Sequence, residues 1–123
     1  ACIVSGFNGN DEISLEGENL IYTKLSGEIE FDPASIDLPR PINNEILGKD
    51  AKYNAQRIVE IFNGKEDSFF KSVCINTAFG LLVYEAREMN ETNIMNAYKV
   101  ASDLIKSGDP FNQINKLMEF TNK

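Results

Sequence analysis

Apolar residues in the first third of the chain follow the every-second-residue spacing of β-strands. The run ACIVSG at residues 1–6 is largely apolar and ends at glycine, which suits a buried strand. A loop rich in glycine and asparagine follows over residues 7–12. Between residues 19 and 32 the alternation resumes on both sides of a Ser26-Gly27 turn and predicts a β-hairpin. The alternating apolar residues of the hairpin are Leu20, Tyr22, Ile29 and Phe31.

Prolines interrupt this pattern before a helix begins. Three of them oppose regular structure as far as about Asn43, so we expect a connecting segment on the surface. Asp50 is a suitable N-cap and Gly64 a suitable end for the helix that follows. The prolines are Pro33, Pro39 and Pro41, and the predicted apolar face of the helix consists of Ala51, Ala55, Ile58, Val59 and Phe62.

Three more helices are expected to complete the chain. The second begins at residue 67 or 68 and ends near Glu88, and it is apolar nearly all round over residues 73–83, which predicts a central position. The third spans about residues 90–107 and is followed by Gly108, after which Asp109-Pro110 suit the start of a last helix. Their apolar stripes are Ile94, Tyr98, Ala101 and Ile105 in the third helix and Ile114, Leu117 and Met118 in the last.

A few strands followed by a run of helices predict an α/β or α+β fold rather than a regular βαβ repeat. A sheet built only from the first strand and the hairpin would be small and would have long unpaired edges. We therefore expect this sheet to be incomplete, with further strands upstream in a larger domain. The apolar strand at residue 1, where a domain usually has a frayed polar end, supports the same expectation.

Length and composition describe one ordinary globular domain. The chain has 123 residues, 42% of them hydrophobic, and a mean hydropathy of −0.28. Its longest apolar stretch falls well short of the ~20 residues that cross a bilayer, so no membrane span is expected. The amino terminus does not resemble a signal or transit peptide, which favours a cytoplasmic location.

Charge and residue types argue against several kinds of partner. A net charge of −7, with Lys and Arg scattered along the chain, disfavours nucleic-acid binding. The lack of His and of paired cysteines argues against a zinc site. Cys2 and Cys74 lie far apart in a chain long enough to fold without a disulfide, so free thiols are expected. Cys74, on an apolar helix without a cationic neighbour, is expected to fill the core.

One pair of residues has the chemistry of a functional site. Asp11 and Glu12 place two carboxylates in the loop after the first strand, where α/β proteins commonly bind ligands. Magnesium typically takes one or two carboxylates and completes its shell with water and substrate phosphate oxygens. On a regular strand the two side chains would point to opposite faces, so a shared site requires irregular backbone or two metal ions. On pattern alone, a solvated pair at a turn is the commoner situation.

Two other polar residues are weaker candidates. Arg40 could reach an anionic ligand, although a surface arginine on a rigid loop is the commoner situation. Asn76, in the apolar second helix, is expected to be a core amide bound to a neighbouring backbone carbonyl. We therefore expect Asn76 to be a structural core residue and Arg40 to be an ordinary surface residue.

Several short motifs, in order along almost the whole chain, resemble the anthranilate phosphoribosyltransferase family. IVSG at residues 3–6 and DEIS at residues 11–14 are similar to that family's apolar strand, glycine and D-E-[IVL]-S motif. GKDA at residues 48–51 and NA at residues 54–55 are similar to its G-G-D-A-x-x-N-A pattern, and INTA at residues 75–78 to its helical L-N-A-A. The chain departs from the family at Ser5, Lys49 and Glu18-Asn19, where the family often has His, Gly and Pro-Thr.

The resemblance implies that residues 1–123 form the carboxy-terminal part of a phosphoribosyltransferase-type α/β domain, related to that of nucleoside phosphorylases. It implies that Asp11 and Glu12 bind magnesium on the diphosphate of phosphoribosyl diphosphate. The implied reaction transfers the phosphoribosyl group to anthranilate with release of pyrophosphate in tryptophan biosynthesis, in a cytoplasmic homodimer. The family's helical amino-terminal region, its phosphate loop and its anthranilate contacts lie upstream, so the chain alone is expected to be inactive.

A second hypothesis is a non-catalytic interaction or regulatory module of the same fold. The first hypothesis predicts magnesium-dependent binding of a diphosphate that requires Asp11. The second predicts a partner bound through an apolar patch, regardless of metal.

Overall fold

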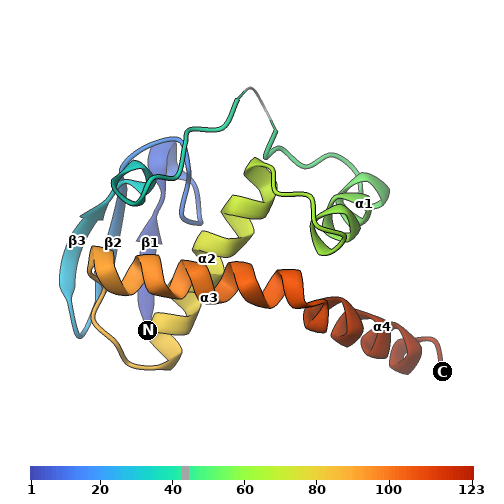
Figure 1. The fold of residues 1–123 in the computed structure, drawn as a ribbon. Helices are drawn as coiled ribbons and strands as arrows, with labels where there is room; N and C mark the ends of the chain where they lie inside the picture. Colours follow the sequence, from blue (N-terminus) through green and yellow to red (C-terminus); the bar gives the residue numbers. More distant parts are fainter. Residues whose placement is uncertain (43–44) are drawn as a thin grey trace.

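A computed structural model describes residues 1–42 and 45–123 of the chain. In these residues it shows a three-stranded antiparallel sheet and four α-helices (Figure 1). The strands are β1 (Cys2–Ser5), β2 (Asn19–Thr23) and β3 (Gly27–Phe31), and the helices are α1 (Ala51–Phe62), α2 (Ser68–Tyr84), α3 (Glu91–Ser107) and α4 (Asp109–Thr121). Figure 1 shows α2 and α3 crossing beside the sheet, with α4 extending away from it. The predicted fold, a small sheet with a hairpin followed by about four helices, is confirmed.

β2 is the central strand, and its register determines which residues face the core. Ile21 pairs with Val4 of β1 and with Ile29 of β3, and these three side chains pack in one core cluster. Tyr22 pairs with Ile3 instead, and both are exposed on the outer face. The buried residues of β2 are Asn19, Ile21 and Thr23, so the apolar alternation at Leu20 and Tyr22 marks the outer face.

β1 is an edge strand within the part of the chain that the structure describes, not the buried strand that its apolar sequence predicts. It pairs with β2 on one side, and Ile3 is 67% exposed. Cys2 and Val4 turn toward the core, where both are half-buried. An apolar run does not by itself distinguish a strand covered on both faces from a strand with one open face.

α2 is the central helix, as the apolar stretch over residues 73–83 predicts. It contributes buried side chains to a cluster against the sheet and to another among the helices. Phe79 packs on Phe31 of β3 with the ring centroids 5.3 Å apart. Cys74 is fully buried, and burial raises the pKa of its thiol to about 12, so it fills the core as expected.

The carboxyl end of α2 lies at Tyr84 rather than near Glu88 because the chain forms a Schellman motif there. Arg87 N donates to Leu82 O at 3.0 Å, and Ala86 N donates to Val83 O at 3.2 Å. Ala86 adopts a φ of 52°, a left-handed conformation that usually favours glycine. With alanine at this position, the sequence carries no glycine signal for the end of the helix.

The apolar faces of the outer helices α1 and α4 are more exposed than their amphipathic patterns predict. In α1, Phe62 of the predicted apolar face packs against the core, but Ile58 and Val59 are 38% and 41% exposed and the buried residue is Ile61, so the prediction is only partly right. No residue of α4 is buried, and Leu117 is 60% exposed. The buried residues of α3, by contrast, include the predicted Ile94, Ala101 and Ile105.

Among residues 1–42 and 45–123, no helix combines the length and the apolarity that a membrane span requires. The free state expected of both cysteines is also observed, with Cys2 half-buried and Cys74 buried.

The segment after β3 is more ordered than its prolines predict. Residues 33–36 form a short 3-10 turn capped by the Asp32 side chain, with proline in the first position, where its missing N–H costs nothing. The segment lies on the surface, as predicted, but its buried residues Pro33 and Leu38 anchor it to the core. Its predicted end near Asn43 lies outside the described residues.

Arg40 joins this segment to the acidic loop, which connects β1 to β2 and carries Asp11 and Glu12. Its guanidinium forms two hydrogen bonds with the Asp32 carboxylate, at 2.8 and 2.6 Å, and donates to Leu15 O at 3.1 Å. Arg40 is exposed, as expected, and its bonds to Asp32 and Leu15 give it a structural role that the sequence did not indicate.

We predict that Leu82→Asp unfolds the chain. Leu82 is 1% exposed in the cluster between α2 and the sheet, and an unpaired buried carboxylate costs several kcal/mol against a total stability of about 5–15 kcal/mol. Tyr84→Asp on the same helix is the matched control, because Tyr84 is 89% exposed. Thermal melts followed by circular dichroism measure both. A Leu82→Asp melt within a few degrees of the parent would contradict the central position of α2.

A second prediction concerns acid. The hydrogen bond from Arg40 holds the pKa of Asp32 below its usual value of 3.8. A carboxylate with a lowered folded-state pKa contributes stability above its unfolded pKa, and that stability disappears as the pH falls through the folded pKa. Because the pair is partly exposed, Arg40→Met should cost about 1 kcal/mol or less at pH 7.

The cost of Arg40→Met should shrink as the pH falls below 3.8. Urea unfolding at a series of pH values measures it. Introduced into an Asp32→Asn background, Arg40→Met should show no such acid dependence. A cost that stays constant into acid in the parent background would show that the ion pair is not its source.

Candidate functional site

The acidic pair lies in the loop that connects β1 to β2. The loop leaves β1 through a 3-10 turn, Phe7–Gly9, in which Asn8 has a positive φ of 58°. Asparagine tolerates this left-handed conformation because its short side chain can hydrogen-bond locally. Asp11 and Glu12 follow with exposed side chains on irregular backbone. The backbone condition for a shared site is therefore met.

Gly6 fixes the start of the acidic segment, residues 10–13, which contains Asp11 and Glu12. Its N–H donates to Asn10 O at 2.8 Å. A Cβ atom at Gly6 would lie 2.1 Å from the Glu12 carbonyl oxygen, far inside van der Waals contact. Glycine at this position therefore allows the Glu12 backbone to lie directly against the end of β1.

The side-chain amide of Asn19 organises the rest of the loop from inside the sheet. Its Oδ1 accepts from Phe7 N at 3.2 Å and from Ser14 N at 2.8 Å. Its Nδ2 donates to Ser14 O and Gly17 O at 3.0 Å each, and to Phe31 O of β3 at 3.2 Å. Asn19 is 0% exposed, so both ends of the loop are bound to one buried group.

Asn76 of α2 binds the same loop from the helix side. Its Oδ1 accepts from Ile13 N at 2.8 Å, and its Nδ2 donates to Ile13 O and to Ser72 O at 3.0 Å each. The expected bond between this amide and a backbone carbonyl is present. The residue it holds, Ile13, comes directly after Glu12.

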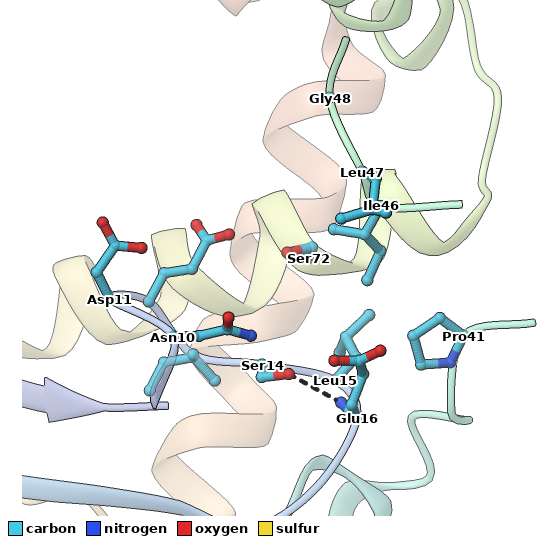
Figure 2. A pocket seen from close by; sticks show the side chains of 12 residues that line it. Asn10, Asp11, Ser14, Leu15, Glu16, Pro41, Ile46, Leu47, Gly48 and Ser72 are labelled. Atoms are coloured by element: carbon cyan, nitrogen blue, oxygen red, sulfur yellow. Dashed lines mark hydrogen bonds between the residues drawn. The ribbon is translucent and has the colours of Figure 1, made fainter. Parts of the chain in front are cut away.

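The acidic pair borders an open depression of about 310 Å³. Figure 2 shows Asp11 and Glu16 well apart along the loop, with Ser14 between them and with Ser72 of α2 above the loop in this view. The Ser14 hydroxyl accepts from Glu16 N at 3.1 Å, which holds this part of the loop in a tight turn. The far wall consists of Pro41, Ile46, Leu47 and Gly48, from the segment that leads to α1.

The same two acids border a second depression of about 320 Å³ on their other side. Its walls are Cys2 and Val4 of β1 and Asn76, Phe79, Gly80 and Val83 of α2. Asp11 and Glu12 thus form a ridge between two hollows. Because both residues line both hollows, the two carboxylates lie in the same region of the surface.

The donor set of the ridge fits a hard divalent cation. Carboxylate oxygens are the protein ligands that magnesium prefers, and it commonly uses one or two of them while keeping several waters. In the described ranges, no group of three or more His, Cys, Asp or Glu side chains gathers to hold a metal ion. The two carboxylates of the ridge would be the protein ligands of an ion bound here, with the remaining positions facing solvent.

The structure separates the candidates that the sequence suggested. Asp11 and Glu12 lie together, Asn76 supports them through Ile13, and Cys74 and Arg40 serve the core and the segment after β3. Asn19 is the residue that the sequence reasoning missed. Besides its departure from the family pattern, its signal in the sequence is a polar side chain two positions before Ile21, on the same face of the strand.

The loop after a strand of a helix-covered sheet, where Asp11 and Glu12 lie, is a common place for ligand sites in α/β proteins. The comparison with known families agrees. The chain belongs to the glycosyl transferase family, whose a/b domain matches residues 1–111.

Among curated proteins, the chain is similar to anthranilate phosphoribosyltransferases. It is 33% identical over 120 residues to that of Pelagibacter ubique and 34% identical over 125 residues to that of Petrotoga mobilis. These alignments cover 95% and 99% of this chain but 35% of each relative. The chain therefore spans about a third of the length of the curated relatives it matches.

Solved structures share the fold. The anthranilate phosphoribosyltransferase of Thermus thermophilus matches with a TM-score of 0.85 at 18% identity, covering 100% of this chain and 36% of that one. That of Saccharomyces cerevisiae matches with a TM-score of 0.79 at 21% identity, covering 93% and 33%. A variant of the yeast enzyme with Mg bound matches with a TM-score of 0.74 at 19% identity, again covering 93% and 33%.

We predict that Gly6→Ala distorts the acidic loop and lowers stability by about 1–3 kcal/mol, because the new methyl group overlaps the Glu12 carbonyl. Gly80→Ala is the counterpart: Gly80 is exposed in α2 with no atom near its added Cβ, so alanine should stabilise the helix by roughly 0.5–1 kcal/mol. Urea unfolding of both variants measures the contrast. Equal stability of Gly6→Ala and the parent would show that the loop does not need this close approach.

Proposed function

We propose that this chain is part of an enzyme that transfers the phosphoribosyl group of phosphoribosyl diphosphate to anthranilate, with release of pyrophosphate, in tryptophan biosynthesis. The observation that carries the proposal is the exposed pair Asp11-Glu12 on a fixed loop at the end of β1, in a chain similar to anthranilate phosphoribosyltransferases. Residues 1–123 would form the carboxy-terminal part of the α/β domain. The helical domain and the phosphate loop would lie elsewhere in the intact protein.

Asp11 and Glu12 are the residues that would hold magnesium in this proposal. When bound, the ion supplies charge stabilisation to the departing pyrophosphate. The two carboxylates would supply oxygen ligands, and the contacts of Gly6 and Asn76 hold the loop backbone that carries them. A yeast relative of the same fold with Mg bound supports the choice of ion.

The charge of the chain agrees with a metal-mediated site. A chain with a net charge of −7 repels a free diphosphate, so the carboxylates can only contribute to its binding through a cation. The same charge disfavours nucleic acid as a partner. The proposal extends to small-molecule substrates, a cytoplasmic location and a homodimeric intact enzyme.

One observation favours the alternative, a non-catalytic interaction module. The outer face of the sheet exposes Ile3, Leu20 and Tyr22 side by side, at 67%, 42% and 51%. Exposed apolar patches often mark interaction surfaces. A partner bound there would be independent of metal, which separates this reading from the enzymatic one.

We predict that Asp11→Asn and Glu12→Gln each lower turnover of the intact enzyme by roughly two orders of magnitude or more, because each weakens the electrostatic stabilisation of the leaving group. Neither change should reduce stability appreciably, since both side chains are exposed. Steady-state kinetics at saturating magnesium measure turnover.

Glu16→Gln provides the matched comparison, because Glu16 lines the same depression and the change removes the same charge. It should leave turnover within a few-fold of the parent. Near-normal turnover in Asp11→Asn and Glu12→Gln would remove the pair from the mechanism. An equal loss in all three variants would indicate a general effect of negative potential instead of metal ligation.

A further inference from the structure

Asn76 binds both polar backbone groups of a single loop residue. Its Oδ1 accepts from Ile13 N at 2.8 Å while its Nδ2 donates to Ile13 O at 3.0 Å. The Nδ2 group also donates to Ser72 O, one turn earlier in α2, at 3.0 Å, which fixes the amide on its own helix. A contact through two atoms sets the direction of the main chain at Ile13 as well as its position.

The contact replaces a missing strand neighbour. After Ser5 the loop leaves the sheet, so its backbone groups have no ladder partners and need others where they are buried. Asn19 satisfies the N–H and C=O of Ser14, and Asn76 satisfies those of Ile13. Two consecutive residues are therefore bound by amides on opposite sides, one in the sheet and one in a helix.

The acidic segment is consequently fixed at both ends. At its start, Gly6 N donates to Asn10 O at 2.8 Å. At its end, Asn76 holds Ile13, whose side chain is 1% exposed in the core. Asp11 and Glu12 occupy the two positions between these anchors. If the Asn76 contact is lost, the Ile13 main chain loses its side-chain partner, and the end of the segment is held only by the buried Ile13 side chain and by the bonds of Asn19 to Ser14.

We propose that Asn76 is a positioning residue for divalent-cation binding by Asp11 and Glu12. It acts through the Ile13 main chain, because its oxygen accepts from Ile13 N and its nitrogen donates to two carbonyls. The inference rests on the proposed function of the acidic pair. Groups that orient metal ligands typically change metal affinity by about 10–100-fold when they are removed.

The test is Asn76→Ala in the intact protein, with calorimetric titration of inorganic pyrophosphate at a series of Mg²⁺ concentrations. The Mg²⁺ concentration for half-maximal binding should rise by about 10–100-fold. Amide hydrogen exchange supplies a second readout. Exchange should accelerate at Ile13, which loses its acceptor, and stay slow at Ser14, whose acceptor is Asn19.

Two further variants separate positioning from general stability. Thr77→Ala removes the neighbouring half-buried side chain of α2, and Ile105→Val weakens the core cluster that does not touch the loop. Both should keep the Mg²⁺ dependence of the parent. If Asn76→Ala does not fold, Asn76→Ser replaces it, since serine is too short to span both atoms of Ile13.

Parent-like Mg²⁺ dependence in Asn76→Ala or Asn76→Ser would overturn the inference. An equal loss of Mg²⁺ affinity in Ile105→Val would overturn it too, since the effect would then follow stability. If the parent binds no pyrophosphate in the presence of Mg²⁺, the proposed function fails and the inference with it. This outcome can be told apart from failure of the inference alone, because the parent protein itself then gives no binding signal in the titration.

Discussion

The buried amide of Asn19 is the interaction on which the arrangement of the acidic loop depends. It sits in the central strand, where neighbours on both sides fix its backbone, and it binds Phe7, Ser14, Gly17 and Phe31. A buried amide without partners would cost several kcal/mol, so the loop and the amide require each other. The loop has no ladder of its own, and this side chain supplies the bonds that a neighbouring strand would otherwise provide.

The exposed site therefore takes its geometry from the core. α2 packs Phe79 against the sheet and, one turn earlier, presents Asn76 to the loop, so the packing of that helix sets the distance between the loop and the sheet. Loops often carry functional residues on a rigid scaffold. Here the scaffold binds the loop through the side-chain amides of Asn19 and Asn76. Asp11 and Glu12 are exposed and do not take part in the packing of the core.

The sequence was informative wherever the determinant of structure is local. The hairpin, the N-cap Asp50, the start of α2 at residue 67 or 68 and the central position of α2 follow from neighbouring residues and agree with the sequence-based expectation. Whether a face is covered depends on residues far away in the sequence. The open face of β1 and the exposed residues of α1 could therefore not be predicted. Asn19 was flagged as a departure from the family pattern, but its five hydrogen bonds involve residues up to twelve positions away, which no local pattern encodes.

The position of Ile13, the buried residue directly after the acidic pair, explains how Asp11 and Glu12 can be both exposed and well positioned. A carboxylate buried for rigidity would lose hydration and resist ionisation, which works against binding a strongly hydrated cation. A carboxylate on a free loop would keep its hydration but lose entropy on ordering. In this chain the buried residue is Ile13 and the exposed ones are Asp11 and Glu12 directly before it. The loop backbone is thus ordered on folding by groups that carry no charge, and the charged groups remain in water.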